Sequence, residues 1–227
     1  MSFRAPAGLK GMTRLISDIS MSLDGFVAGP NPSLEQPLGA RGERLHEWAF
    51  RLKSWREPHG LAGGESGPDD DVVAEMQRGI GAVVMGRRMF SGGEGPWEDD
   101  PNADAWWGDD PPFHGPVFVL THHPRETVEK QGGTSFTFVT DGLEAALEQA
   151  RAAAGGKDFH VPGGASVIQQ CLNAGVLDEL QVHLVPVLLG GGTRLFEGLD
   201  EPVELEATRV VCSPAVTHLR LAIRAPR

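Results

Sequence analysis

A short apolar strand, two consecutive glycines and a helical pattern follow one another directly in residues 160–168, which read His-Val-Pro-Gly-Gly-Ala-Ser-Val-Ile. Paired glycines let a ligand approach the backbone closely, because neither residue carries a Cβ atom. The helix that follows directs its free N–H groups and the positive end of its dipole at the same place. The chain therefore contains a strand joined tightly to a helix, and the turn predicts an anion-binding site that is weakly specific on its own.

Strand-like and helix-like patterns alternate along the rest of the chain. Strands are expected over 14–22, 82–85, 116–120, 136–139, 159–161, 180–189 and 216–223. Helices are expected over 45–55, 71–80, 141–150 and 165–172, with Asp141 and Glu144 as a capping box and Gly175 as a stop. Strand–helix–strand order predicts a parallel part of the sheet, and the closely spaced last strands predict an antiparallel edge. We therefore expect an α/β fold with a mixed central sheet.

Composition excludes several classes of protein. The 227 residues suit one generous domain, and the net charge of -11 argues against a nucleic-acid partner. No apolar run is long enough to span a bilayer, and Met1 to Lys10 lack a signal-peptide pattern. Cys171 and Cys212 are the only cysteines, so no disulfide framework is indicated and a cytoplasmic location is expected.

Two further apolar strands end in polar groups that suit an anionic ligand. Gly86 ends one of them and is followed by Arg87 and Arg88, which can grip a phosphate or can simply be solvated. Thr121 and His122 follow the next strand and could contact a ribose phosphate. His122 and His123 are adjacent, so on an extended chain they point to opposite faces, and we expect no metal site there.

The order of these motifs resembles a known family. Ser20-Met21-Ser22-Leu23-Asp24-Gly25-Phe26-Val27-Ala28 comes first, and then Met85-Gly86-Arg87-Arg88, Val119-Leu120-Thr121, Pro162-Gly163-Gly164, Leu177-Asp178-Glu179-Leu180 and Pro186-Val187-Leu188-Leu189-Gly190. The sequence is similar to the reductase domain of the bacterial bifunctional riboflavin-biosynthesis deaminase-reductase. The resemblance covers about residues 14–223. It implies a three-layer, dihydrofolate reductase-like fold with a mainly parallel sheet and helices on both faces.

The resemblance also implies NADPH as the cofactor. The Gly-Arg turn and the following strand end would hold the 2′-phosphate side, the Gly-Gly turn the pyrophosphate, and the loop after Asp24 would lie over the nicotinamide. The cofactor-binding residues it implies are Ser20, Val27, Ala28, Gly86, Arg87, Arg88, Thr121, His122, Pro162, Gly163, Gly164, Ala165 and Ser166. Preference for NADPH would then rest on Arg87 and Arg88.

The chain also departs from that family. It lacks the His-x-Glu and Pro-Cys-x-x-Cys deaminase signature, so the bifunctional enzyme itself is excluded. The segments 30–68 and 92–114 are long, loop-rich insertions, and the second carries Trp97, Trp106 and Trp107. Because these loops would rim the substrate side, the riboflavin enzyme's own substrate is not carried over.

Three adjacent acids are the candidates for a proton donor. Asp69, Asp70 and Asp71 open a helix, and one of the three, with Asp70 and Asp71 as the named candidates, could face a substrate as a raised-pKa acid. The same residues are also the preferred cap of a helix, and Asp24 in Asp-Gly suits a turn. Water is a further proton source.

The sequence thus predicts an NADPH-dependent reductase, in one domain, acting on a small pterin-, pyrimidine- or flavin-precursor-like heterocycle. Two alternatives stay open: a protein that binds NADP(H) without turnover, as a sensor or stress-related module, and dihydrofolate reductase proper. The expected partner is a small-molecule substrate, without nucleic acid or membrane, and homodimerisation is expected from the frequency of such dimers.

Overall fold

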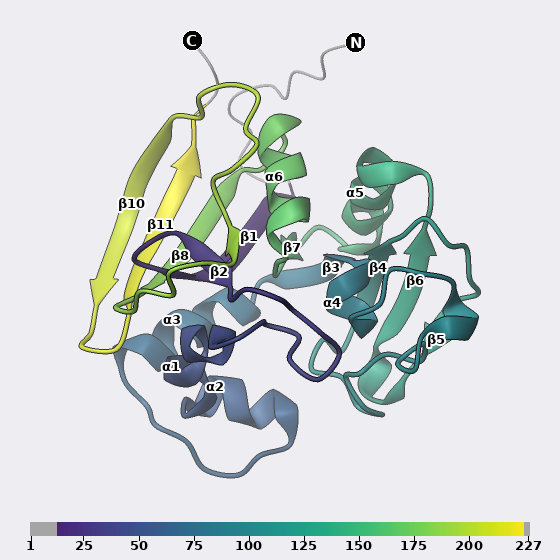
Figure 1. The fold of residues 1–227 in the computed structure, drawn as a ribbon, viewed down its shortest axis with the longest axis horizontal. Helices are drawn as coiled ribbons and strands as arrows, with labels where there is room; N and C mark the ends of the chain where they lie inside the picture. Colours follow the sequence, from purple (N-terminus) through teal and green to yellow (C-terminus); the bar gives the residue numbers. More distant parts are fainter. Residues whose placement is uncertain (1–12, 225–227) are drawn as a thin grey trace.

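The computed structural model describes residues 13–224, and its main sheet has nine strands in the order β10-β11-β8-β1-β7-β3-β4-β6-β5 (Figure 1). Its strands are β1 (Leu15–Ser22), β3 (Ile80–Gly86), β4 (Pro116–Leu120), β5 (Val128–Glu129), β6 (Ser135–Val139), β7 (Asp158–Val161), β8 (Glu179–Val185), β10 (Leu205–Cys212) and β11 (Thr217–Ile223). The segment 1–10, which lacks a signal-peptide pattern, lies outside the described residues. A small second sheet pairs β2 (Phe26–Ala28) with β9 (Thr193–Arg194).

The central strands of the sheet are parallel, and its C-terminal edge is antiparallel. Parallel pairs join β8 to β1, β1 to β7, β7 to β3, β3 to β4 and β4 to β6. Strand β11 pairs antiparallel with both β8 and β10. The expected mixed, mainly parallel sheet with antiparallel C-terminal strands is therefore confirmed.

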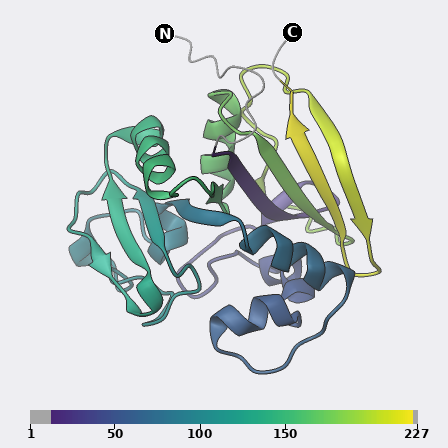
Figure 2. The same ribbon diagram turned by 180° about the vertical axis from the view of Figure 1, so that it is seen from behind.

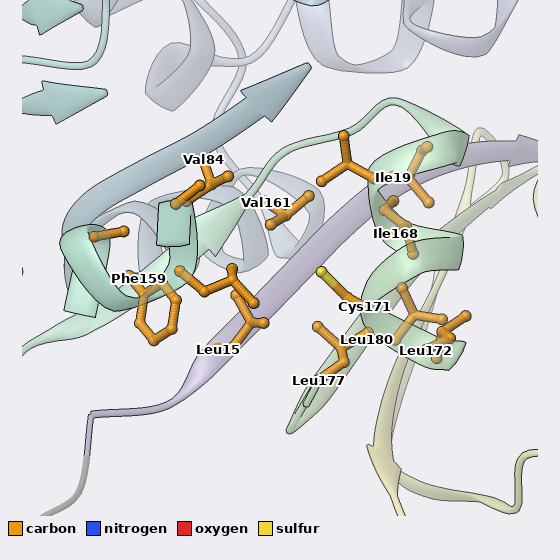
Figure 3. Packing of buried hydrophobic residues seen from close by; sticks show 14 of the residues in the cluster. Leu15, Ile19, Val84, Phe159, Val161, Ile168, Cys171, Leu172, Leu177 and Leu180 are labelled. Atoms are coloured by element: carbon orange, nitrogen blue, oxygen red, sulfur yellow. The ribbon is translucent and has the colours of Figure 1, made fainter. Parts of the chain in front are cut away.

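Helices cover both faces of the sheet (Figures 1 and 2). Helices α5 (Gly142–Ala153) and α6 (Ala165–Asn173) pack on one face against apolar residues such as Val84 and Leu180 (Figure 3). On the other face, α4 (Arg87–Ser91) contributes Phe90 to a cluster with Val83 and Met85. Neighbouring residues of β3 thus enter cores on opposite faces, as a strand in the middle of a three-layer fold requires.

The first insertion folds into short helices. These are η1 (Gly42–Leu45), α1 (Glu47–Phe50), α2 (Lys53–Arg56) and η2 (Glu57–His59), followed by α3 (Pro68–Gln77). The single helix expected over 45–55 is wrong, because Leu52 has extended backbone angles and bridges to Glu65. The helix expected over 71–80 begins earlier, at Pro68, a residue suited to a first helical turn.

Three other expectations are decided by local backbone geometry. Gly175 does stop α6, with a φ of +64°. Asp141 precedes α5 but makes no side-chain capping hydrogen bond, so the predicted capping box is wrong. Strand β8 ends at Val185 instead of Leu189, because Pro186 has no N–H to donate to a neighbouring strand.

The remaining short 3-10 helices, η3 (Trp97–Asp99) and η4 (Gln131–Gly133), lie in loops beside α4 and β6. Among residues 13–224, no helix has the length and apolar character needed to cross a membrane.

Candidate functional site

The segments expected to bind the cofactor all lie at one edge of the main sheet. Because β1, β7, β3 and β4 run parallel, their carboxyl ends at Ser22, Val161, Gly86 and Leu120 share that edge. Open α/β sheets bind ligands outside the carboxyl ends of their strands. The topology therefore gathers four segments that are far apart in sequence.

The end of β3 packs closely against the first part of α6. A Cβ atom added to Gly86 would lie 3.3 Å from Cγ2 of Val167, a buried residue of that helix. The turn after β3 therefore lies near the start of the helix that follows the Gly-Gly turn. Glycine at position 86 is what allows this close approach.

The Gly-Gly turn is buried at Gly163 and exposed at Gly164. Gly163 has a φ of +127°, a region that favours glycine, and its peptide bond to Gly164 is cis. A Cβ atom on Gly164 would meet no protein atom within 4 Å. The nine-residue helix α6 follows at once, and Gly164 supplies no side chain to cap it. Free N–H groups at the start of a helix suit an anion such as a diphosphate.

The two arginines after Gly86 have different environments. Arg87 is buried, its Nη2 lies 2.5 Å from Oδ2 of Asp100, and its guanidinium carbon stacks 3.6 Å from the ring centre of Trp97. The sequence left two roles open for Arg87, a phosphate ligand or a solvated residue. In the structure it instead anchors the second insertion through these two contacts. Arg88 pairs with Glu94 at 2.5 Å. Because its side chain is largely exposed, it remains available to a ligand.

The other residues expected at the cofactor are distributed between surface and interior. Thr121 is buried, and its Oγ1 accepts a hydrogen bond from the backbone of His123, whereas His122 is exposed. Ser20 is also buried, and its hydroxyl accepts a hydrogen bond from Nε1 of Trp48. Ser20 thus supports the first insertion in this structure.

The loop after β1 is tied down by Asp24. Its carboxylate accepts hydrogen bonds from the hydroxyl of Ser22 and from the backbone N–H groups of Leu189 and Gly190. The hydrogen bond from Ser22 is the largest cause that lowers the pKa of Asp24, to about 2, and those from Gly190 and Leu189 act in the same direction. Asp24 is therefore more than the turn residue expected: it joins the β1–β2 loop to the segment that follows β8. Strand β2 follows this loop and contains buried Val27 and half-buried Ala28.

The acidic start of α3 separates into three roles. Asp70 is buried and accepts a hydrogen bond from the backbone N–H of Ser54, and Asp71 is exposed. Asp69 instead reaches the sheet, where its Oδ1 lies 3.2 Å from Nε2 of His218. Asp70 thus binds the first turn of α2 and Asp71 is a surface residue, whereas Asp69 makes the contact with the polar face of the sheet.

A row of polar side chains on four adjacent strands escaped the sequence interpretation. His160 of β7 contacts Asp18 of β1, Asp18 lies 3.4 Å from His183 of β8, and His183 contacts His218 of β11 at 2.8 Å. We call His160, Asp18, His183, His218 and Asp69 the polar row. A sequence signal did exist: Asp18, Ser20 and Ser22 alternate with apolar residues along β1.

The row is enclosed on its central part and open at its ends. The side chains of His183 and His218 are 3% and 5% exposed, and the ring of Trp48 lies about 5 Å from both imidazoles, at 5.0 and 5.1 Å. The side chain of Asp18 keeps 17% exposure. Solvent and a substrate can therefore reach Asp18 more easily than its histidine partner.

The pKa values along the row follow from this burial. Burial opposes ionisation of Asp18, but His160 and His183 outweigh it and hold the pKa of this carboxyl well below its usual range. Burial and then the neighbouring His183 lower the pKa of His218 to about 4, against the opposite effect of Asp69. The row thus combines an ionised carboxylate with a neutral imidazole. Within residues 13–224 no group of three or more His, Cys, Asp or Glu side chains is arranged to hold a metal ion.

Comparisons with known proteins bear on the family and the fold of the chain. The family model described as the RibD C-terminal domain matches residues 13–219. YyaP of Bacillus subtilis (strain 168), an uncharacterized protein, is 22% identical over 200 residues, which is 85% of each chain. A Shewanella sp. PV-4 protein named for riboflavin biosynthesis has a TM-score of 0.62 at 21% identity, over 94% of this chain and 100% of that one. Enterococcus faecalis dihydrofolate reductase, solved with NADP(H), has a TM-score of 0.50 at 16% identity, over 93% and 97%. These two structures share the fold.

Proposed function

The chain belongs to the RibD C-terminal domain family, a family of reductases, and we propose that it transfers a hydride from NADPH to a small heterocyclic substrate. A pterin, a pyrimidine or a flavin precursor is the proposed class. The proposal rests chiefly on one observation, the contact between the Gly86 turn and the start of α6 at Val167. That contact brings the turn after β3 close to the start of the helix that follows the Gly-Gly turn, and both places suit a phosphate.

Residues at and beside these two turns would each hold one part of the cofactor. The exposed backbone of Gly164, with the first N–H groups of α6, would hold the diphosphate. Arg88 would hold the 2′-phosphate, since Arg87 is engaged with Asp100. Bound there, the nicotinamide supplies the hydride, and the protein supplies position and a shielded pocket.

The loop that Asp24 secures would close the nicotinamide side of the site. Its hydrogen bonds to Leu189 and Gly190 fix the backbone of residues 24–28 beside the carboxyl edge of the sheet. The first insertion, with Trp48 buried against β1, would form the substrate side. Both elements would exclude water from the reacting atoms.

Two measurements test the proposal. Titration of the purified protein with NADPH, followed by nicotinamide fluorescence, is expected to show saturable binding at micromolar concentrations. Absorbance of the reduced nicotinamide is then followed with pterin, pyrimidine and flavin-precursor substrates, dihydrofolate included. Absence of binding at high micromolar NADPH would overturn the proposal, and binding without oxidation across the panel would favour a sensor. The homodimer and cytoplasmic location remain predictions of the sequence.

A further inference from the structure

The centre of the polar row contains a buried nitrogen without a hydrogen-bond partner. Nε2 of His183 lies 3.4 Å from Oδ2 of Asp18 and is otherwise unsatisfied among the described residues. The side chain of His183 is only 3% exposed. A buried polar atom left without a partner is costly, so a group in this position calls for an explanation.

A count of the protons along the row explains this unpartnered nitrogen. Three contacts join two imidazoles and two carboxylates: Asp18 to His183, His183 to His218, and His218 to Asp69. Each contact is attractive only when one proton lies between its two atoms. Two neutral imidazoles carry two protons, and two ionised carboxylates carry none. One of the three contacts therefore lacks a proton unless the row binds one more.

The geometry of the row decides where that proton lies. An ionised Asp69 accepts a hydrogen bond from Nε2–H of His218, at 3.2 Å. Nδ1 of a neutral His218 must then accept the proton of Nδ1–H of His183, at 2.8 Å. The unfilled contact is the one between Nε2 of His183 and Oδ2 of Asp18, which is also the longest of the three.

We propose that His183 and Asp18 share an additional proton at rest, and that this proton is the one consumed when the substrate is reduced. At rest the proton lies on His183, which makes it an imidazolium facing the Asp18 carboxylate. His218 and Asp69 are positioning residues that fix the tautomer of His183. This inference rests on the proposed function and adds the proton source to it.

The chemistry balances with a reduced nicotinamide dinucleotide as the hydride donor. The hydride forms a new C–H bond at the substrate carbon, and the nicotinamide is oxidised. The adjoining nitrogen takes the proton, which passes from His183 through Asp18, so His183 becomes neutral and Asp18 ends as a carboxylate. Asp18, the more exposed member of the pair, regains a proton from solvent after product leaves and returns it to His183.

Other titratable and charged groups surround the pair. His160 contacts the other oxygen of Asp18. Burial lowers the pKa of His46, in the loop before α1, while the charge of Asp18 raises it and that of His183 lowers it further. Arg209 of β10 lowers the pKa of His218. Since the Asp18 carboxylate keeps 17% exposure, a neutral heterocycle that gains an N–H on reduction suits it better than an anion.

Nitrogen-15 NMR of histidine-labelled protein tests the proton store directly and without cofactor. We expect both ring nitrogens of His183 to have imidazolium shifts at pH 7, and His218 to be neutral with its proton on Nε2. In Asp18→Asn, the amide can donate to Nε2, so His183 is expected to become neutral in a protein that stays folded. His59→Gln, at an exposed histidine outside the row, is the matched control and should leave the His183 signals unchanged.

Transient kinetics then tests the use of the proton. Asp18→Asn should slow the single-turnover hydride step by about 100-fold or more while NADPH affinity stays unchanged. A neutral His183 at pH 7 in the unsubstituted protein overturns the inference. So does a hydride step that Asp18→Asn leaves at full rate. A charged His183 in a protein that never binds NADPH would instead uphold the proton store and overturn the proposed reductase function.

Discussion

Arg87 and Asp100 form a buried ion pair, with Nη2 of the arginine 2.5 Å from Oδ2 of the aspartate. Ser91 donates a hydrogen bond to the same carboxylate at 2.7 Å. Burial opposes the ionisation of Asp100, but the hydrogen bonds from Ser91 and Asn102 and the contact with Arg87 outweigh it and lower its pKa. The pair joins the insertion 92–114 to the short helix α4, so this loop has a fixed attachment to the sheet.

Replacing Arg87 by methionine should strongly destabilise the protein. The change leaves the Asp100 carboxylate buried without its cation, which costs about 3–5 kcal/mol. Chemical unfolding of Arg87→Met beside Arg88→Met measures this loss, and the exposed Arg88 should cost less than about 0.5 kcal/mol. The double variant Arg87→Met/Asp100→Leu should recover part of the stability. Equal losses for the two single arginine variants would show that the pair contributes little.

Arg88 and Glu94 should set the preference between NADPH and NADH. Glu94 would compete for Arg88 with the 2′-phosphate of the proposed cofactor, so Glu94→Gln is expected to strengthen NADPH binding and leave NADH binding unchanged. Arg88→Gln should weaken NADPH binding about tenfold, which corresponds to about 1.4 kcal/mol. Fluorescence titrations with both dinucleotides measure the ratio. Exposed Arg78→Gln serves as the control of net charge, and an identical loss in that variant would rule out a local effect of Arg88.

Gly164→Ala should weaken cofactor binding in a protein that remains folded. The added Cβ meets no protein atom, and the φ of -74° suits alanine, but the methyl group fills the space through which a diphosphate reaches the backbone. We expect the NADPH dissociation constant to rise at least about tenfold, equivalent to about 1.4 kcal/mol.

Gly79→Ala is the matched control for that variant, because its Cβ also meets open space and it lies outside the carboxyl edge. Unfolding midpoints and dissociation constants are measured for both. Unchanged NADPH affinity in Gly164→Ala would place the diphosphate elsewhere.

The polar row should make stability depend on pH on the acidic side. His218 has a folded pKa of about 4, below the value of about 6.5 for an unperturbed histidine. The unfolded chain therefore binds this proton first as the pH falls, and the stabilising effect of a neutral His218 is lost between about pH 6.5 and pH 4. Urea unfolding across this window, compared with His218→Gln, measures it. A slope that the variant does not flatten would exclude His218 as its source.

The sheet could be predicted from the sequence wherever burial imposes a pattern. The run 116–120 is buried on both sides and was predicted at its observed bounds. Strand β10 was missed because it is an edge strand, almost fully exposed, and its residues carry no alternation of apolar and polar character. The broken helices of the first insertion depend on tertiary contacts, such as the bridge from Leu52 to Glu65, that no local spacing reports.

The candidate site was predictable only in part, for a related reason. Glycine favours turns because it lacks a Cβ atom, so Gly86, Gly163 and Gly164 could be predicted from the sequence. The partners of a buried charge come from the fold: Asp18 contacts a histidine 142 residues away. In the same way, only the fold shows that Arg87 belongs to Asp100 and that Asp69, and not Asp70, reaches the polar row.

The alternation of β1 carries one more consequence. Leu15 and Ile19 enter the apolar core below α6, and Asp18 and Ser20 face the opposite side. A slip of one residue between β1 and its neighbours would place the Asp18 carboxylate in that apolar core and Ile19 among the histidines. Misregistered chains would thus be both unstable and chemically inert. The strand pairing that forms the sheet therefore also ensures that only correctly folded chains contain the polar row.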